Sequence, residues 1–229
     1  MEIYVGLDLS KNHYGLTLFK EDKVFLYYVY IKPFTKTELK KLGNSITDSI
    51  SVDEDITKDN LSFKKIKINV NPEINQIGLD ALKSKNINST IQTILKEHSH
   101  SNEDKIYVSL EDYIIINNGI VSLVHTTEQF KYDFLKEENR RLFLCCNASW
   151  KKLLGKEASK KPTGKDRYEN LKNFIRTSHN DIHDFMVSLN QNDDVIKDLI
   201  DSWGLAMAWR HKDNPIFKVS YSKRIFNSY

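Results

Sequence analysis

The sequence predicts an α/β protein with one mixed sheet that is flanked by helices. Three β-rich runs come first, at residues 2–9, 14–19 and 23–31, and no helical pattern separates them. Helical and strand-like patterns then alternate along the rest of the chain. This order predicts a five-stranded sheet in which three antiparallel strands are followed by parallel strands that are joined through helices.

Length and composition favour one globular domain over residues 1–229. The chain has 229 residues, of which 40% are apolar and 28% charged, and this is enough to bury a sizeable core. No stretch approaches the roughly 20 apolar residues of a membrane span. The two cysteines, Cys145 and Cys146, are adjacent and poorly placed for a disulfide. We therefore expect a soluble, intracellular protein, in the cytoplasm of a prokaryote or of a virus-infected host cell.

The first three strands are indicated by their local patterns. Val5, Leu7 and Leu9 are spaced as the core-facing residues of a strand, and the polar stretch "SKNHYG" leads to the second strand. The third strand, "KVFLYYVYI", stops before Pro33. Residues 35–75 mix polar residues, an acidic cluster "DEDITKD" and one short strand "FKKIKINV", so we interpret them as an insertion after the third strand.

The second half alternates between helices and strands. One or two helices fit residues 76–97, and a strand begins near Lys105. A Thr-x-Glu signal predicts a helix over 126–139, and "RLFLCCN" is typical of a short buried strand. Two further helices are predicted, one from about Lys165 and one over "DDVIKDLIDSWGLAMAWRHK", where the leading acids favour a helix start.

Four carboxylates are the candidate functional residues. Asp8 lies near the end of an apolar strand, where burial without a partner would cost several kcal/mol. Glu111 ends the fourth strand, although its neighbour Asp112 is an alternative. Asp198 and Asp201 are one turn apart and share a helix face. If the first and fourth strands are neighbours and the last helix packs across their ends, these four side chains converge.

A convergent group of carboxylates predicts a site for Mg²⁺, with Mn²⁺ as a substitute. Asp and Glu oxygens are hard ligands that suit these ions, and such a cluster repels itself unless cations are bound. Two ions about 4 Å apart can activate a water molecule and stabilise the leaving oxygen of a phosphodiester. This chemistry explains why carboxylates are needed in place of His or Cys.

Three stretches resemble the RuvC-type Holliday junction resolvases. "VGLDLSKNHYGLTLF" resembles the opening hairpin of that family, "YVSLEDY" its fourth strand with a Glu, and "DLIDSWGLAMAW" its closing Asp-x-x-Asp helix. The three matches occur in the family's order, and they cover nearly the whole chain if residues 35–75 are an insertion. Two departures are the turn "DLSKNHYG", where Asp-Pro-Gly or Asp-Xaa-Gly is commoner, and Ser202, where Ala is usual.

The resemblance implies a ribonuclease H-like fold in which Asp8, Glu111, Asp198 and Asp201 hold two Mg²⁺ ions. It also implies a homodimer that nicks two opposed strands of a four-way DNA junction. The long segment 35–75 leaves the junction specificity more open than the nuclease chemistry.

A basic segment between residues 150 and 176 is the candidate DNA-binding region. Lysines and arginines cluster there, between Trp150 and Tyr168, and phosphates attract such clusters even when the net charge of the chain is only +3. An ordinary solvated loop is the competing interpretation. The predicted DNA contacts are Lys151, Lys152, Lys160, Lys161, Lys165 and Arg167.

Other functions stay open at this point. A related nuclease could act on another substrate, in DNA packaging, in transposition or on RNA–DNA hybrids. An ATP-binding protein of the actin and sugar-kinase type also has an early Asp, but "LSKN" lacks the glycine turn that grips phosphate. A non-catalytic junction-binding module would not need all four acids.

Overall fold

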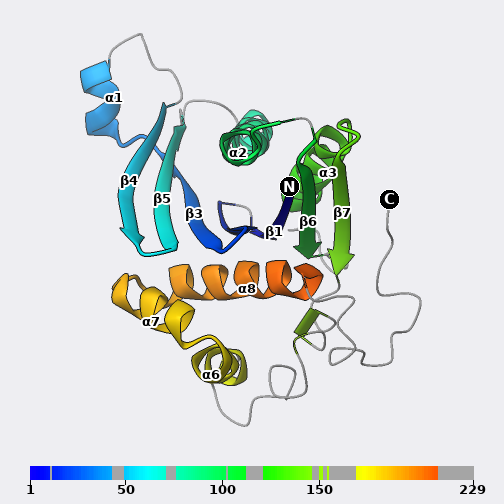
Figure 1. Cartoon of the computed structure of the whole chain (residues 1–229). Coiled ribbons are helices and arrows are strands. Elements are labelled where there is room, and N and C mark those ends of the chain that lie inside the picture. The colour runs from blue at the N-terminus through cyan, green and yellow to red at the C-terminus, as the bar shows by residue number, and fades with distance from the viewer. Residues whose placement is uncertain are drawn as a thin grey trace.

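The computed structural model has three layers, with a sheet between two layers of helices. It describes residues 1–10, 12–42, 49–70, 76–101, 103–111, 121–145, 150–151, 154 and 169–210. Helices α2 (Gln76–His98) and α3 (Val121–Phe134) cover one face of the sheet, and α8 (Asp193–Arg210) runs across the other (Figure 1). The predicted α/β class is confirmed.

Seven strands form the described part of the sheet, in the order β4-β5-β3-β2-β1-β6-β7. The strand β1 pairs antiparallel with β2 and β2 antiparallel with β3, whereas β6 is parallel to β1 and β7 is parallel to β6. The seven strands are β1 (Glu2–Leu9), β2 (His13–Lys20), β3 (Lys23–Pro33), β4 (Ser49–Lys58), β5 (Leu61–Val70), β6 (Lys105–Glu111) and β7 (Arg140–Cys145).

The insertion differs from the prediction because it contributes two strands to the sheet. The predicted strand is present as β5, which pairs in parallel with β3, and β4 pairs antiparallel with β5 at the sheet edge. The acidic residues Asp53, Glu54 and Asp55 therefore lie within a strand. Lys65 contacts Glu54 at 3.1 Å and Lys64 contacts Asp55 at 3.4 Å, so lysines on β5 balance this acidic strand. The described part of the sheet therefore has seven strands in place of the predicted five, and the two additional strands are β4 and β5.

Alternation along the strands builds a separate apolar core on each face of the sheet. On β1, Val5, Leu7 and Leu9 are buried with residues of α2 and α3. The intervening positions, among them Gly6 and Asp8, point to the α8 side because successive side chains of a strand alternate between faces. The second core surrounds α8 and contains Trp203 and Trp209.

Two helices differ from their predicted bounds. Helix α3 begins at Val121, so Thr126 lies inside it; the Thr126 hydroxyl lies 2.6 Å from that of Ser84 on α2 and does not cap a helix. The region after residue 168 forms two helices, α6 (Glu169–Ser178) and α7 (Asn180–Ser188). The short helix α1 (Lys36–Leu42) follows β3.

Helix α8 starts where the sequence predicts it. The Asn192 side chain accepts a hydrogen bond of 3.0 Å from the backbone N–H of Val195, and Asp193 and Asp194 occupy the first turn, where the helix dipole favours acids. Eleven of its residues are buried, from Val195 to Trp209. None of the helices in the described ranges is both long enough and apolar enough for a membrane span.

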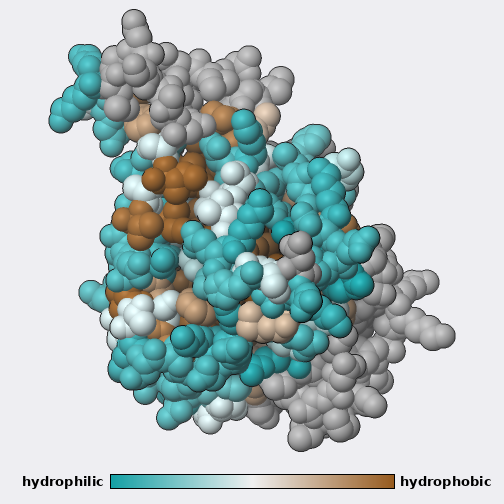
Figure 2. Space-filling model, turned by 45° about the horizontal axis from the view of Figure 1, so that its top comes forward, coloured by the Kyte–Doolittle hydropathy of each residue, from teal (hydrophilic) through white to brown (hydrophobic). Residues whose placement is uncertain are grey.

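Strand β4 leaves apolar side chains in contact with solvent. Ile50 and Val52 are 57% and 55% exposed and pair across the sheet with Ile68 and Ile66, which belong to the core beside α2. Figure 2 shows apolar surface on the face of the molecule that carries α1 and α2. The sheet therefore extends beyond the helices that cover it.

Acid is expected to weaken the contact between α2 and the sheet through His98. Burial lowers the pKa of His98 to about 4, and its Nε2 lies 2.7 Å from the Tyr27 hydroxyl. The unfolded chain takes up this proton near pH 6.5, so the free energy of unfolding should fall by about 2 kcal/mol from this residue between pH 6.5 and pH 4. Urea unfolding across this range should show a smaller fall for His98→Gln, whereas an unchanged fall would contradict the assignment.

Candidate metal centre

Asp8 and Glu111 lie side by side at the carboxyl ends of two adjacent parallel strands. Leu7 on β1 is level with Leu110 on β6, so the following residue of each strand, Asp8 or Glu111, lies at the same edge. Both side chains point to the α8 face, since Leu7 and Leu110 point to the opposite core. The first and fourth predicted strands, β1 and β6, are therefore adjacent in the sheet, as the candidate site requires.

Two glycines allow the last helix to lie directly on the sheet. A Cβ atom at Gly6 would overlap the backbone carbonyl oxygen of Ser202, and one at Gly15 would overlap the carbonyl oxygen of Asp198. Because Gly15 is level with Asp8 in the β1–β2 register, this close approach brings Asp198 to the strand pair. Sequence reasoning missed this role of the glycines, although a glycine within a strand pattern is a signal of close backbone approach.

The Asp8 carboxyl lies where the charges of the other three predicted carboxylates act on it. Burial raises the pKa of Asp8 well above its usual range, and the negative charges of Asp201, Asp198 and Glu111 raise it further. The Lys151 ammonium acts in the opposite direction. Within the described part of the chain, the Asp8 carboxyl receives no hydrogen bond, so a bound cation would supply the interaction that the protein does not.

Glu111 is held by a buried indole. The Trp150 Nε1–H donates a hydrogen bond of 3.4 Å to Glu111 Oε1, while the ring packs against Gly204 of α8, where a Cβ atom would collide with it. Burial raises the pKa of Glu111, and the bond from Trp150 together with the Lys151 charge opposes this rise. Trp150 therefore fixes one candidate ligand and touches the helix that carries two others.

Asp198 is held by His13, a histidine that was not among the predicted site residues. His13 Nδ1 on β2 lies 2.6 Å from Asp198 Oδ2. The hydrogen bond to Asp198 raises the pKa of His13 more than burial lowers it, and the charges of Asp198 and Asp194 add to the rise. A histidine at the start of the second strand carries no recognisable signal of this contact, because the two residues are 185 positions apart.

Asp201 lies beside the one predicted DNA contact that the structure describes. Lys151 Nζ is 3.9 Å from Asp201 Oδ1 and 4.9 Å from the centroid of the Trp150 ring. The other predicted DNA contacts lie outside the described residues: Lys152, Lys160, Lys161, Lys165 and Arg167. The same holds for Asp112, the alternative to Glu111. Lys151 is therefore placed among the carboxylates, where its charge partly balances theirs.

Ser202, where the resemblance to RuvC-type resolvases leads one to expect Ala, makes hydrogen bonds at the interface between helix α8 and the sheet. Its hydroxyl lies 2.8 Å from that of Thr17 on β2 and donates a bond of 3.0 Å to the Leu199 carbonyl. Both hydroxyls are buried. The pair fixes the position of α8 along the sheet one residue away from Asp201.

The chemistry of the donor set fits a divalent cation, and the side chains as placed are spread apart. Four carboxylates from three elements offer the oxygen ligands that Mg²⁺ and Mn²⁺ prefer. Among the described residues, no three such side chains are close enough to one point to hold a single ion. Asp198 is held by His13, and Asp201 lies beside Lys151.

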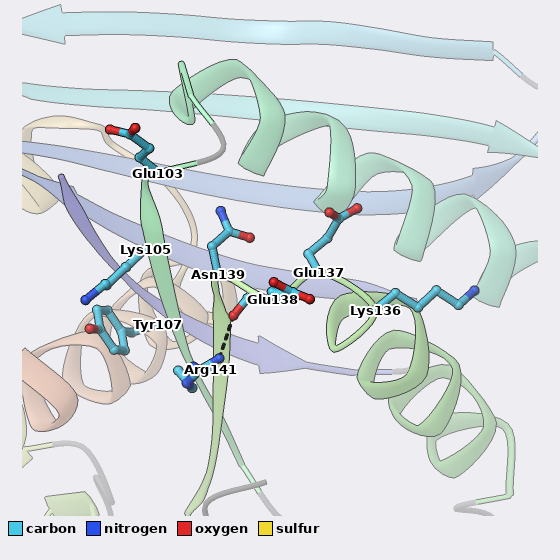
Figure 3. A pocket seen from close by; sticks show the side chains of 8 residues that line it. All are labelled: Glu103, Lys105, Tyr107, Lys136, Glu137, Glu138, Asn139 and Arg141. Carbon is cyan, nitrogen blue, oxygen red and sulfur yellow. Dashed lines mark hydrogen bonds between the residues drawn. The ribbon is translucent and has the colours of Figure 1, made fainter.

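A hollow lies at the amino ends of β6 and β7, at the other end of β6 from Glu111. It is lined by none of the predicted site residues. Figure 3 shows side chains of both charges around it, with Arg141 bonded to the Glu138 carbonyl oxygen. Lys105 and Tyr107 enter it from β6. This mixture of charges gives the hollow no evident preference for cation or anion.

Comparisons with protein-family models, curated proteins and solved structures found no match for this chain.

Proposed function

We propose that this protein is a metal-dependent endodeoxyribonuclease of the ribonuclease H-like superfamily that resolves four-way DNA junctions in the manner of RuvC. The observation that carries the proposal is that Asp8 and Glu111 lie on two adjacent parallel strands, on the face of the sheet against which α8 packs with Asp198 and Asp201. A carboxylate such as Asp8, whose pKa is raised by burial and by acids from other elements, is typical of functional sites.

The strand order supports the fold part of this proposal. Without the β4–β5 hairpin the sheet reads β3-β2-β1-β6-β7, with three antiparallel strands followed by two strands parallel to β1. This is the arrangement that the resemblance to RuvC-type resolvases implies. The hairpin adds to the outer edge of β3, away from Asp8, so it leaves the proposed core undisturbed.

In the proposed mechanism, two Mg²⁺ ions, or Mn²⁺ in their place, would be held by Asp8, Glu111, Asp198 and Asp201. When bound, such ions would activate a water molecule for attack on phosphorus and would stabilise the departing 3′ oxygen. Trp150 orients Glu111 through its indole N–H. Lys151 makes the potential around Asp201 less negative, which lowers the repulsion that an approaching phosphate meets.

The proposed substrate is branched DNA bound by a homodimer. Lys151 lies beside Asp201, and the sequence that follows it is rich in lysine and arginine, a composition that attracts phosphates. Two copies of the site would make the paired nicks that release two duplexes.

Cleavage of a defined panel of substrates tests the proposed function. We expect Mg²⁺-dependent, symmetric paired nicks on an immobile four-way junction, and much slower cleavage of a flap, a linear duplex and an RNA–DNA hybrid. The measurement is mapping of end-labelled products on denaturing gels, with EDTA as the control. Preferential cleavage of another member of the panel would keep the nuclease and change its substrate, whereas no metal-dependent cleavage at all would overturn the proposal.

A further inference from the structure

We infer that His13 is a positioning residue that holds Asp198 in place as a metal ligand, an inference that rests on the proposed function. His13 Nδ1 lies 2.6 Å from Asp198 Oδ2. A carboxylate only accepts hydrogen bonds, so Nδ1 carries the hydrogen and donates it. Within the described part of the chain, Oδ1 of Asp198 has no hydrogen-bond partner, and this oxygen is left for the cation.

Backbone and side chain of Asp198 are fixed by the same strand. Gly15 on β2 touches the backbone carbonyl of Asp198, and its missing Cβ makes this contact possible. His13 precedes Gly15 by two residues, so both lie on the α8 face of β2. The strand thereby sets both the position of the helix and the rotation of this one carboxylate.

The imidazole ring is itself held by its neighbours. Its centroid lies 5.9 Å from that of Tyr28 on β3, at an interplanar angle of 32°, and Tyr28 in turn stacks on Tyr30. The His13 side chain is 37% exposed and that of Asp198 is 16% exposed. A ring that is packed on one side and open on the other can hold a ligand without blocking access to it.

A side chain that donates a hydrogen bond to a metal ligand affects metal binding through the ligand that it orients. Hydrogen-bond partners of metal-binding side chains set the orientation of the ligand and its basicity, and removing one costs about 10- to 100-fold in metal affinity or activity. Loss of the His13 bond would let Asp198 rotate among other conformations and would weaken the cation site. Contacts with DNA away from the ions would be unaffected.

Three variants separate positioning from a merely structural role. His13→Leu removes the hydrogen bond and keeps side-chain bulk, whereas His13→Asn places an amide N–H close to the position of Nδ1. His183→Leu is the matched control, because His183 makes the same kind of contact with Asp184, at 3.0 Å and outside the site. The two readouts are Mn²⁺ binding to the DNA-free protein by calorimetry and junction cleavage as a function of Mg²⁺ concentration.

We expect His13→Leu to weaken Mn²⁺ binding about 10- to 100-fold and to recover cleavage at high Mg²⁺ with an unchanged KM for the junction. His13→Asn should lie within a few-fold of the wild type, and His183→Leu should match it. Unchanged metal binding in His13→Leu would overturn the inference, as would a cleavage defect that no Mg²⁺ concentration repairs. A wild-type protein that neither binds Mn²⁺ nor cleaves DNA would instead overturn the proposed function.

Discussion

Replacing Asp8 by Asn is expected to reduce metal-dependent junction cleavage by a factor on the order of 10³ or more, because it removes a ligand that contributes several kcal/mol of transition-state stabilisation. The substitution should not reduce the stability of the folded protein. In EDTA, Asp8→Asn should raise the free energy of unfolding by about 1 kcal/mol, since it removes a partly buried carboxyl that lacks a hydrogen bond and faces three other acids. Single-turnover cleavage and urea unfolding measure the two effects.

The opposite signs of these two effects make the prediction specific. A variant that merely misfolds would lose both activity and stability. Asp133→Asn on α3, on the other face of the sheet, is the matched control: it breaks only a helix-surface ion pair with Lys136 and should leave cleavage unchanged. Near wild-type cleavage by Asp8→Asn at ordinary Mg²⁺ concentrations would remove Asp8 from the site.

Gly6→Ala is expected to destabilise the protein by about 3 kcal/mol, at the upper end of the cost of overpacking. The added methyl group would meet backbone atoms of α8, the Ser202 carbonyl oxygen and the Ala206 amide nitrogen, and backbone atoms cannot rotate away as a flexible side chain can. The helix must therefore move off β1 and take Asp198 and Asp201 with it. Urea unfolding gives the loss of stability, and Mn²⁺ binding should weaken in parallel.

Ser109→Ala provides the control at the neighbouring position. Ser109 on β6 is level with Gly6, is fully buried and already carries a Cβ atom. Its hydroxyl has no hydrogen-bond partner among the described residues, so its removal should cost little. A loss below about 1 kcal/mol for Gly6→Ala, similar to that for Ser109→Ala, would show that α8 does not lie so close to β1.

Much of the fold could be predicted because the sheet core and the last helix have strong periodic patterns. The strands from β1 to β3 alternate or are continuously apolar, and α8 shows a clear apolar stripe. Strand β4 could not be predicted, because it lies at the edge with nearly all its residues exposed and shows no periodic burial. Its central acids are typical of a loop, and it is a strand because β5 offers it backbone partners and lysines.

The candidate ligands could be predicted, and the residues that hold them could not. The four carboxylates come at places that the sequence patterns define: near the ends of strands for Asp8 and Glu111, and one helical turn apart for Asp198 and Asp201. His13 and Trp150 act through contacts across long sequence separations, which a single sequence does not reveal. The candidate site also depends on the close approach of α8 to two glycines, Gly6 on β1 and Gly15 on β2. A glycine within a strand pattern can be recognised in the sequence, so this part of the arrangement could have been predicted.

The long sequence separation between His13 and Asp198, 185 residues, also bears on when the candidate site can form. A ribosome makes Asp8 early and α8 late, so a growing chain has the first candidate ligand long before it has the last two. The four carboxylates can therefore come together only after α8 has been made. Under the proposed function, an incomplete chain would not cleave DNA.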